Sequence, residues 1–222
     1  QFADRLEKAE DFKTELNLII KEVVEQNGRI IFNGDGYSEE WEREAERRGL
    51  LNLRSTVDAI PLLKSDKNIE MFEKHKVLNR TEINSRVDII LENYTKILHI
   101  EALTLIDMMN REVVPAITAY TNKLCKAVLN KNSVGGINTT VERELIARLS
   151  AANKEIYSLT NELKMAVATA ERTTDVMEKA VLYHDTILRL MSDIRKYADS
   201  AESVMPSDCW PYPSYGDLLF NI

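Results

Sequence analysis

Residues that break helices are scarce in this chain of 222 residues, which has seven glycines and five prolines. Leu, Glu, Lys and Ala recur instead. Apolar residues make up 44% of the chain and charged residues 29%, so the chain can bury a core and stay dissolved. This composition favours helices and predicts an all-α protein.

Cysteine is almost absent. Cys125 and Cys209 are the only two, and they stand far apart, in neither a metal-binding nor a redox spacing. The pattern predicts a reduced, cytoplasmic setting.

Basic charge and long apolar runs are also lacking. The net charge is -7, which argues against a nucleic-acid partner, because such partners are bound largely by clustered Lys and Arg. No apolar run approaches the roughly 20 residues that span a bilayer, and no signal peptide opens the chain. We therefore expect neither nucleic acid nor membrane as a partner.

The chain opens on Gln1-Phe2-Ala3, without a Met or a helix-capping residue. This opening predicts a fragment of a longer protein that starts partway through a helix, with ordinary processing as the alternative. Apolar residues then recur every three or four positions as far as Val24, which predicts one helix of about 25 residues that ends near Asn27-Gly28. Residues 33–36 predict a tight turn that needs positive φ, and Ser38 is placed to cap a helix that stops at Gly49.

Residues 50–80 predict only short helical turns. From Thr81 an apolar stripe continues over 40-odd residues and predicts the longest helical rod, residues 81–129, bent near Pro115. Residues 131–136 break the rod, and Thr139 and Glu142 match a capping box for the next helix. A further stripe reaches residue 201, and a break at Thr173-Thr174 is left open.

Long rods joined by a short loop pack antiparallel. We therefore predict a long antiparallel helical hairpin or three-helix bundle over residues 81–205. It follows a smaller N-terminal helical subdomain (1–80, the helical end of a catalytic domain) and precedes an extended C-terminal tail (206–222).

The residues alone indicate no active site. The segment RIIFNGDGYSEEW (29–41) lacks the third glycine of a dinucleotide loop and the lysine of a P-loop, and it fits a calcium loop poorly, so a capped turn is the better interpretation. His75 lies in a charged connection, His99 and Glu101 face different ways on a helix, and His184 fits a packed core position. The prediction is no catalytic, cofactor-binding or metal-binding residue.

The tail carries an unusual aromatic strip. We predict that its anchors dock as a clasp on the helices or on a catalytic domain outside the chain, because large apolar side chains are costly to leave in water. These anchors are Trp210, Tyr212, Tyr215 and Phe220.

Three stretches together resemble the C-terminal part of the type III glutamine synthetases, in order and in spacing. They are NGDGYSEEWEREAERRGLLNL (33–53), LENYTKILHIEALTLIDMMNREVVPAITAY (91–120) and WPYPSYGDLLF (210–220). The resemblance implies an enzyme that joins ammonia to glutamate with ATP and Mg²⁺ or Mn²⁺. It also implies that the metal-binding and nucleotide-binding residues precede Gln1, so no catalytic residue and no cofactor is carried over to this chain.

The partners that the resemblance implies are the chain's own catalytic domain and neighbouring subunits of a homo-oligomer. Two hypotheses follow from the sequence. The first is a structural and assembly segment of a glutamate–ammonia ligase, inactive on its own. The second is a self-standing helical module for protein interaction or oligomerisation.

Overall fold

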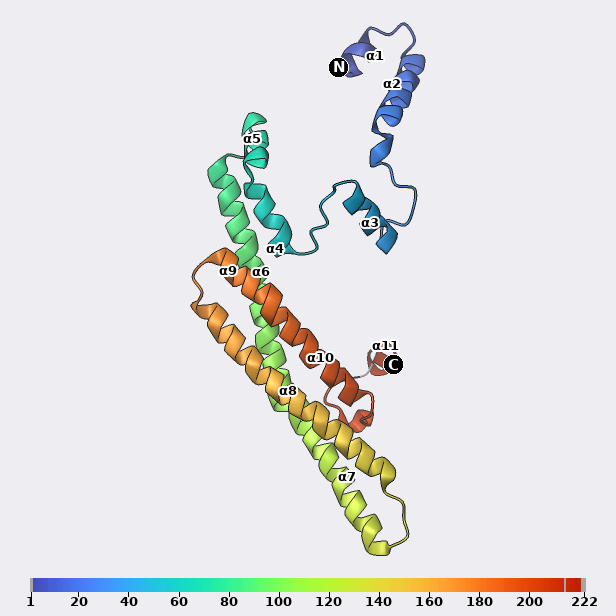
Figure 1. Ribbon diagram of the computed structural model, residues 1–222, viewed down its shortest axis with the longest axis vertical. Coiled ribbons are helices and arrows are strands. Elements are labelled where there is room, and N and C mark those ends of the chain that lie inside the picture. Colours follow the sequence, from blue (N-terminus) through green and yellow to red (C-terminus); the bar gives the residue numbers. More distant parts are fainter. Residues whose placement is uncertain (1, 214, 221–222) are drawn as a thin grey trace. The chain divides into compact units, whose positions relative to one another are not determined.

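The computed structural model describes residues 2–213 and 215–220, and within these residues it contains helices and no strand, as the composition predicted (Figure 1). The chain divides into two compact units, Gln1–Arg54 and Ser55–Ile222. The division predicted from the sequence, 1–80, 81–205 and 206–222, stays a prediction. In the structure the short helices after Ser55 pack on the long helix that follows them.

Unit 1 contains α1 (Phe2–Glu7), α2 (Phe12–Asn27), a short 3₁₀ turn at Gly28–Ile30 and α3 (Glu39–Arg47). The single N-terminal helix expected from the sequence is wrong, because the chain breaks before Asp11. The Asp11 carboxylate accepts hydrogen bonds from the Lys13 amide (3.1 Å) and the Thr14 hydroxyl, which starts a new helix. Arg5 then pairs with Glu22 at 2.7 Å, and α1 lies against α2.

The loop before α3 is held by one aspartate. The Asp35 carboxylate accepts from the Tyr37 amide (2.9 Å), and the Asp35 carbonyl accepts from the Ser38 hydroxyl (2.7 Å). Positive φ was expected at the glycines of residues 33–36 and is wrong, since neither Gly34 nor Gly36 adopts it. The side-chain bond of Asp35 forms the turn without that conformation. Ser38 caps α3 as predicted, and Gly49, at φ +75°, follows its end.

Unit 2 begins with α4 (Thr56–Ala59), a 3₁₀ turn (Ile60–Lys64) and α5 (Asp66–Lys74). Then α6 (Arg80–Met108), a π-helical turn η3 (Met109–Val113) and α7 (Val114–Val134) form one continuous helix of 55 residues, slightly longer than predicted. The π turn ends at Val113, two residues before Pro115. Because proline has no amide hydrogen and crowds the preceding turn, a wider turn at this point accommodates it inside the helix.

Two loops reverse the chain. Gly135 and Gly136, at φ +79° and +71°, end α7. The predicted capping box at Thr139 is wrong: the Thr140 amide donates to the Asn138 side chain (2.7 Å), and Glu142 forms an ion pair with Lys131 across the loop. The open question at Thr173-Thr174 is answered by a break between α8 (Thr140–Arg172) and α9 (Val176–Leu182).

A second π-helical turn, η4 (Tyr183–Ile187), joins α9 to α10 (Leu188–Glu202). A 3₁₀ turn η5 (Ser207–Cys209) and α11 (Tyr215–Leu219) follow. The expectation of a wholly extended tail is therefore wrong. Its prolines all precede Tyr215, so none of them interrupts the last short helix.

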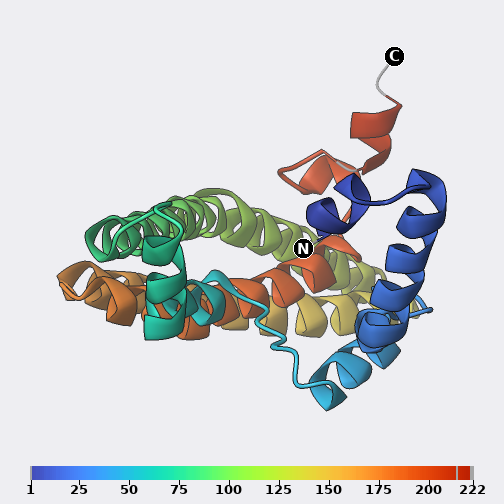
Figure 2. The same ribbon diagram turned by 90° about the horizontal axis from the view of Figure 1, so that it is seen from above.

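The core of unit 2 lies around α8, which runs along α7 on one side and along α10 on the other (Figures 1 and 2). The side chains at its centre are aliphatic and fully buried. They include Ile117, Leu149, Ile156, Leu163, Ile187 and Ile194. A smaller cluster, made by Val57, Val87, Leu91 and Ala180, fixes α4 and α9 to the start of α6. The two clusters tie residues 55–212 into one unit.

Replacing Leu149 by Ala is expected to lower the free energy of unfolding by about 2–5 kcal/mol, because this fully buried side chain of α8 would leave a cavity in the core. Leu129→Ala is the matched control, since Leu129 is also helical but is 68% exposed. Urea unfolding followed by circular dichroism measures both. An equal cost in the two variants would contradict the proposed core.

The turn into α9 gives a second test. The Asp175 carboxylate accepts from the Glu178 amide at 2.8 Å, so Asp175→Ala is expected to lower stability by about 1 kcal/mol. Asp175→Asn keeps the acceptor and is expected to leave stability nearly unchanged. If the Asn variant loses as much as the Ala variant, the side-chain cap is not the stabilising element.

Candidate functional site

The three histidines occupy three separate places. His75 follows the last residue of α5, and the His184 ring lies 2.7 Å from the carboxylate of its neighbour Asp185. The expected core position of His184 is wrong: its side chain is partly exposed, and the buried residue is the adjacent Tyr183. No group of three or more His, Cys, Asp or Glu side chains within residues 2–213 and 215–220 is arranged to hold a metal ion.

His99 has partners that its own helix does not supply. Its Nδ1 atom lies 2.8 Å from the hydroxyl of Tyr183, a residue 84 positions later, and its Nε2 atom lies 3.6 Å from the Glu171 carboxylate. Burial raises the pKa of Tyr183, and Glu171 acts in the same direction. Glu101 takes no part in this contact, as its spacing predicted. The contact fastens α6 to the π turn η4 and to the end of α8, and Tyr183 is buried within it.

The segment 29–41 forms a structural turn rather than a phosphate loop. The Arg48 side chain donates to the carbonyl of Ile31 (3.1 Å) and lies over the Trp41 ring, 6.0 Å from its centroid. Glu44 binds the guanidinium groups of Arg47 and Arg48, which lower the pKa of its carboxyl to about 2. Arg47 and Arg48 are therefore bound to groups within unit 1.

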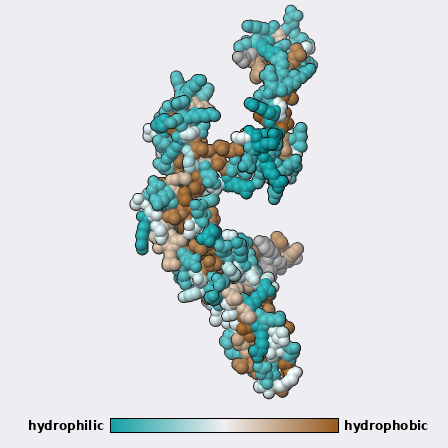
Figure 3. Space-filling model, viewed as in Figure 1, coloured by the Kyte–Doolittle hydropathy of each residue, from teal (hydrophilic) through white to brown (hydrophobic). Residues whose placement is uncertain are grey.

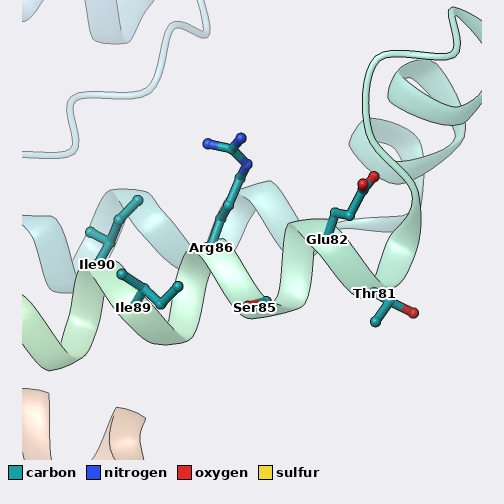
Figure 4. A pocket seen from close by; sticks show the side chains of 6 residues that line it. All are labelled: Thr81, Glu82, Ser85, Arg86, Ile89 and Ile90. Atoms are coloured by element: carbon teal, nitrogen blue, oxygen red, sulfur yellow. The ribbon is translucent and has the colours of Figure 1, made fainter.

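One hollow lies at the start of α6, with a volume of about 630 Å³ (Figure 4). Its lining comes from a single stretch of helix, in which Glu82 and Arg86 point to the same side and Ile89 and Ile90 follow. Glu82 is part of the helix cap, because its carboxylate accepts a hydrogen bond from the backbone N–H of Asn79 at 2.8 Å. An open surface on one helix cannot enclose a ligand, so this hollow is not a candidate site.

A larger groove of about 670 Å³ lies between α6, with its π turn η3, and α10. Its apolar side chains include Leu105, Met108, Met109, Leu188 and Met191. Trp210 and Tyr212 of the tail also line it, and both pack half-buried against the main core. This groove is the candidate functional site, because it joins three segments distant in sequence and contains two of the four residues singled out in the tail.

The other two tail residues are Tyr215 and Phe220. Phe220 is 76% exposed. Tyr215 begins α11, and its side chain lies outside the described residues. The clasp therefore stays a prediction for the tail as a whole. The sequence did not single out the groove residues of α6 and α10, because the apolar stripes of these two helices were assigned to the core.

The Tyr212 hydroxyl gives a pH test of this contact. Burial raises its pKa to about 12, and the Glu112 carboxylate acts in the same direction. Below the ordinary tyrosine pKa of about 10, folded and unfolded chains both keep the proton. Between about 10 and about 12 only the unfolded chain releases it, so stability is expected to fall as pH rises through this window.

Tyr212→Phe is expected to lessen that fall, and Tyr157→Phe, at a residue that is 57% exposed, is expected to leave it unchanged. Part of the fall will remain, because burial also raises the pKa of Tyr94 and Tyr183. Urea midpoints at several pH values measure the effect. Identical profiles for the parent and Tyr212→Phe would show that the hydroxyl is not buried in solution.

Comparison with known proteins gives one family and several relatives. Residues 15–132 match the glutamine synthetase C-terminal domain family. The chain is 35% identical over 214 residues to a glutamine synthetase of Butyrivibrio fibrisolvens and 31% identical over 221 residues to a type-3 glutamine synthetase of Dictyostelium discoideum. A glutamine synthetase of Bacteroides fragilis is 30% identical over 208 residues.

These matches confirm the resemblance seen in the sequence. They cover 96%, 96% and 91% of this chain, but only 31%, 30% and 28% of the relatives, so the chain spans about a third of their length. Two of the three quoted stretches lie within the family match, and the aromatic stretch 210–220 lies beyond it. No helix among the described residues is long and apolar enough to cross a membrane.

Proposed function

Because this chain belongs to the glutamine synthetase C-terminal domain family, we propose that it is the C-terminal helical region of a type III glutamine synthetase. The whole enzyme would make glutamine from glutamate and ammonia with ATP and Mg²⁺ or Mn²⁺ in the cytoplasm. The observation that carries the proposal is the family match itself, joined by three curated glutamine synthetases that align with nearly the whole chain.

The role of the chain within that enzyme is structural. Residues 81–205 are mainly helical, most of their buried positions are aliphatic, and the polar contacts of His99 join α6 to η4 and to the end of α8. ATP and the metal ions would be bound by the rest of the enzyme. Catalysis needs converging polar groups around a pocket. The groove between α6 and α10 is lined mainly by apolar side chains, which supports a structural role.

Exposed apolar residues support packing against other parts of the enzyme. In unit 1, α2 leaves Phe12, Leu18, Ile20 and Val24 about half exposed, and Ile30 and Ile31 follow it. Such a concentration of apolar surface is typical of an interface. The partners that fit are the catalytic domain of the same enzyme and neighbouring subunits of a homo-oligomer.

The isolated chain is expected to show no glutamine synthetase activity. The assay is γ-glutamyl transfer with purified chain and Mg²⁺ or Mn²⁺, and the full-length relative from Butyrivibrio fibrisolvens is the positive control. Activity above background in the chain alone, retained after a further purification step, would overturn the structural role.

A chimera separates this proposal from the alternative of a self-standing interaction module. The third of the Butyrivibrio enzyme that aligns with this chain is exchanged for the chain itself. A chimera that assembles like its parent on size-exclusion chromatography and makes glutamine supports the proposal. A folded chimera that neither assembles nor makes glutamine favours the self-standing module.

A further inference from the structure

The groove between α6 and α10 is long enough for a helix of several turns. Its α6 side runs from Ile100 to Val113, a length of about 20 Å at 1.5 Å per residue, or nearly four helical turns. Ile97, one turn earlier, is 58% exposed and continues the same side of α6. In unit 2, α9 packs along α6, whereas α10 touches α6 at few points. The groove opens where these helices separate.

The floor of the groove is apolar and adaptable. Met109 is almost fully buried, and Leu105, Leu188 and Met191 are half-buried beside it. Figure 3 shows hydrophobic residues at the surface of unit 2 where α9 and α10 cross α6. Methionine side chains fit differently shaped apolar partners because they are unbranched and flexible. Ile100, 64% exposed on the rim, adds apolar surface that no described element covers.

The polar rim of the groove is negatively charged. Glu101 on α6 and Glu202 on α10 line it, and neither forms an ion pair within the described part of the chain. Asp199 and Arg195 also line it, but they pair with each other at 3.6 Å. Two carboxylates thus remain on opposite sides of an apolar floor, which is the charge complement of a ligand with an apolar face and cationic flanks.

We propose that this groove binds a basic amphipathic helix of a partner protein, with the apolar face of that helix on the methionine-rich floor and its Lys or Arg side chains against Glu101 and Glu202. A helix laid in a groove between two helices is a recurrent mode of recognition. The partner is distinct from the tail of this chain, since α11 has five residues and carries Asp217. The site goes beyond the proposed function and does not depend on it.

The test uses a fluorescently labelled peptide of leucine and lysine, about four turns long, whose sequence places its leucines on one helical face. Fluorescence anisotropy measures its binding to the full chain. The groove variant carries Glu101→Gln and Glu202→Gln. The matched control carries Glu144→Gln and Glu162→Gln, two exposed carboxylates of α8, and therefore has the same net charge. Circular dichroism checks that both variants fold.

Binding to the parent should weaken ~10-fold in the groove variant and stay within ~2-fold in the control, because only the groove carboxylates contact the peptide. A scrambled peptide of the same composition should bind ~10-fold more weakly, since it has no apolar face. Three results would each overturn the proposal: no binding, equal weakening in both variants, or equal binding of the scrambled peptide. The last two would show attraction by net charge alone.

Discussion

The burial of one helix between two others is the interaction on which unit 2 depends. On its own, α8 would expose a continuous apolar stripe to water, and the burial of each large aliphatic side chain is worth about 1.5–3 kcal/mol. It buries that stripe along α7 on one side and α10 on the other, so both neighbouring helices are held through it. The reversals at residues 135–136 and 173–175 follow from this requirement, because antiparallel neighbours of one helix need short loops.

The long helix meets a second constraint inside its length, because Pro115 cannot donate a backbone hydrogen bond. The π turn at Met109–Val113 accommodates this and also keeps the apolar face in register. Met109, Val113 and Ile117 follow one another at intervals of four, and all three are buried. In a regular α-helix of 3.6 residues per turn such intervals rotate away from the core, and a wider turn corrects the drift.

The sequence predicted the long helices well and the first residues of helices unevenly: the cap at Ser38 was found, and the start at Asp11 was missed. The stripe from residue 81 located the long helix because its periodicity is repeated many times, and one wrong position cannot hide it. The break at Asp11 and the missing cap at Thr139 depend on one or two side-chain contacts each. There, several side chains compete for the same backbone groups, and spacing alone does not decide which one binds. The intervals of four around Pro115 were a signal for the π turn that the sequence did offer.

Only the tail residues of the candidate site were predictable from the sequence. Trp210 and Tyr212 stood out because aromatic residues between prolines near a chain end are unusual, and both line the groove between α6 and α10. The helix residues of that groove share their helices with the core, so no pattern in the sequence separates an apolar residue that faces α8 from one that faces solvent. The distinction arises from the separation of α10 from α6, which is a property of the packed unit. An apolar floor with Glu101 and Glu202 at its rim therefore becomes visible only when the three segments are brought together.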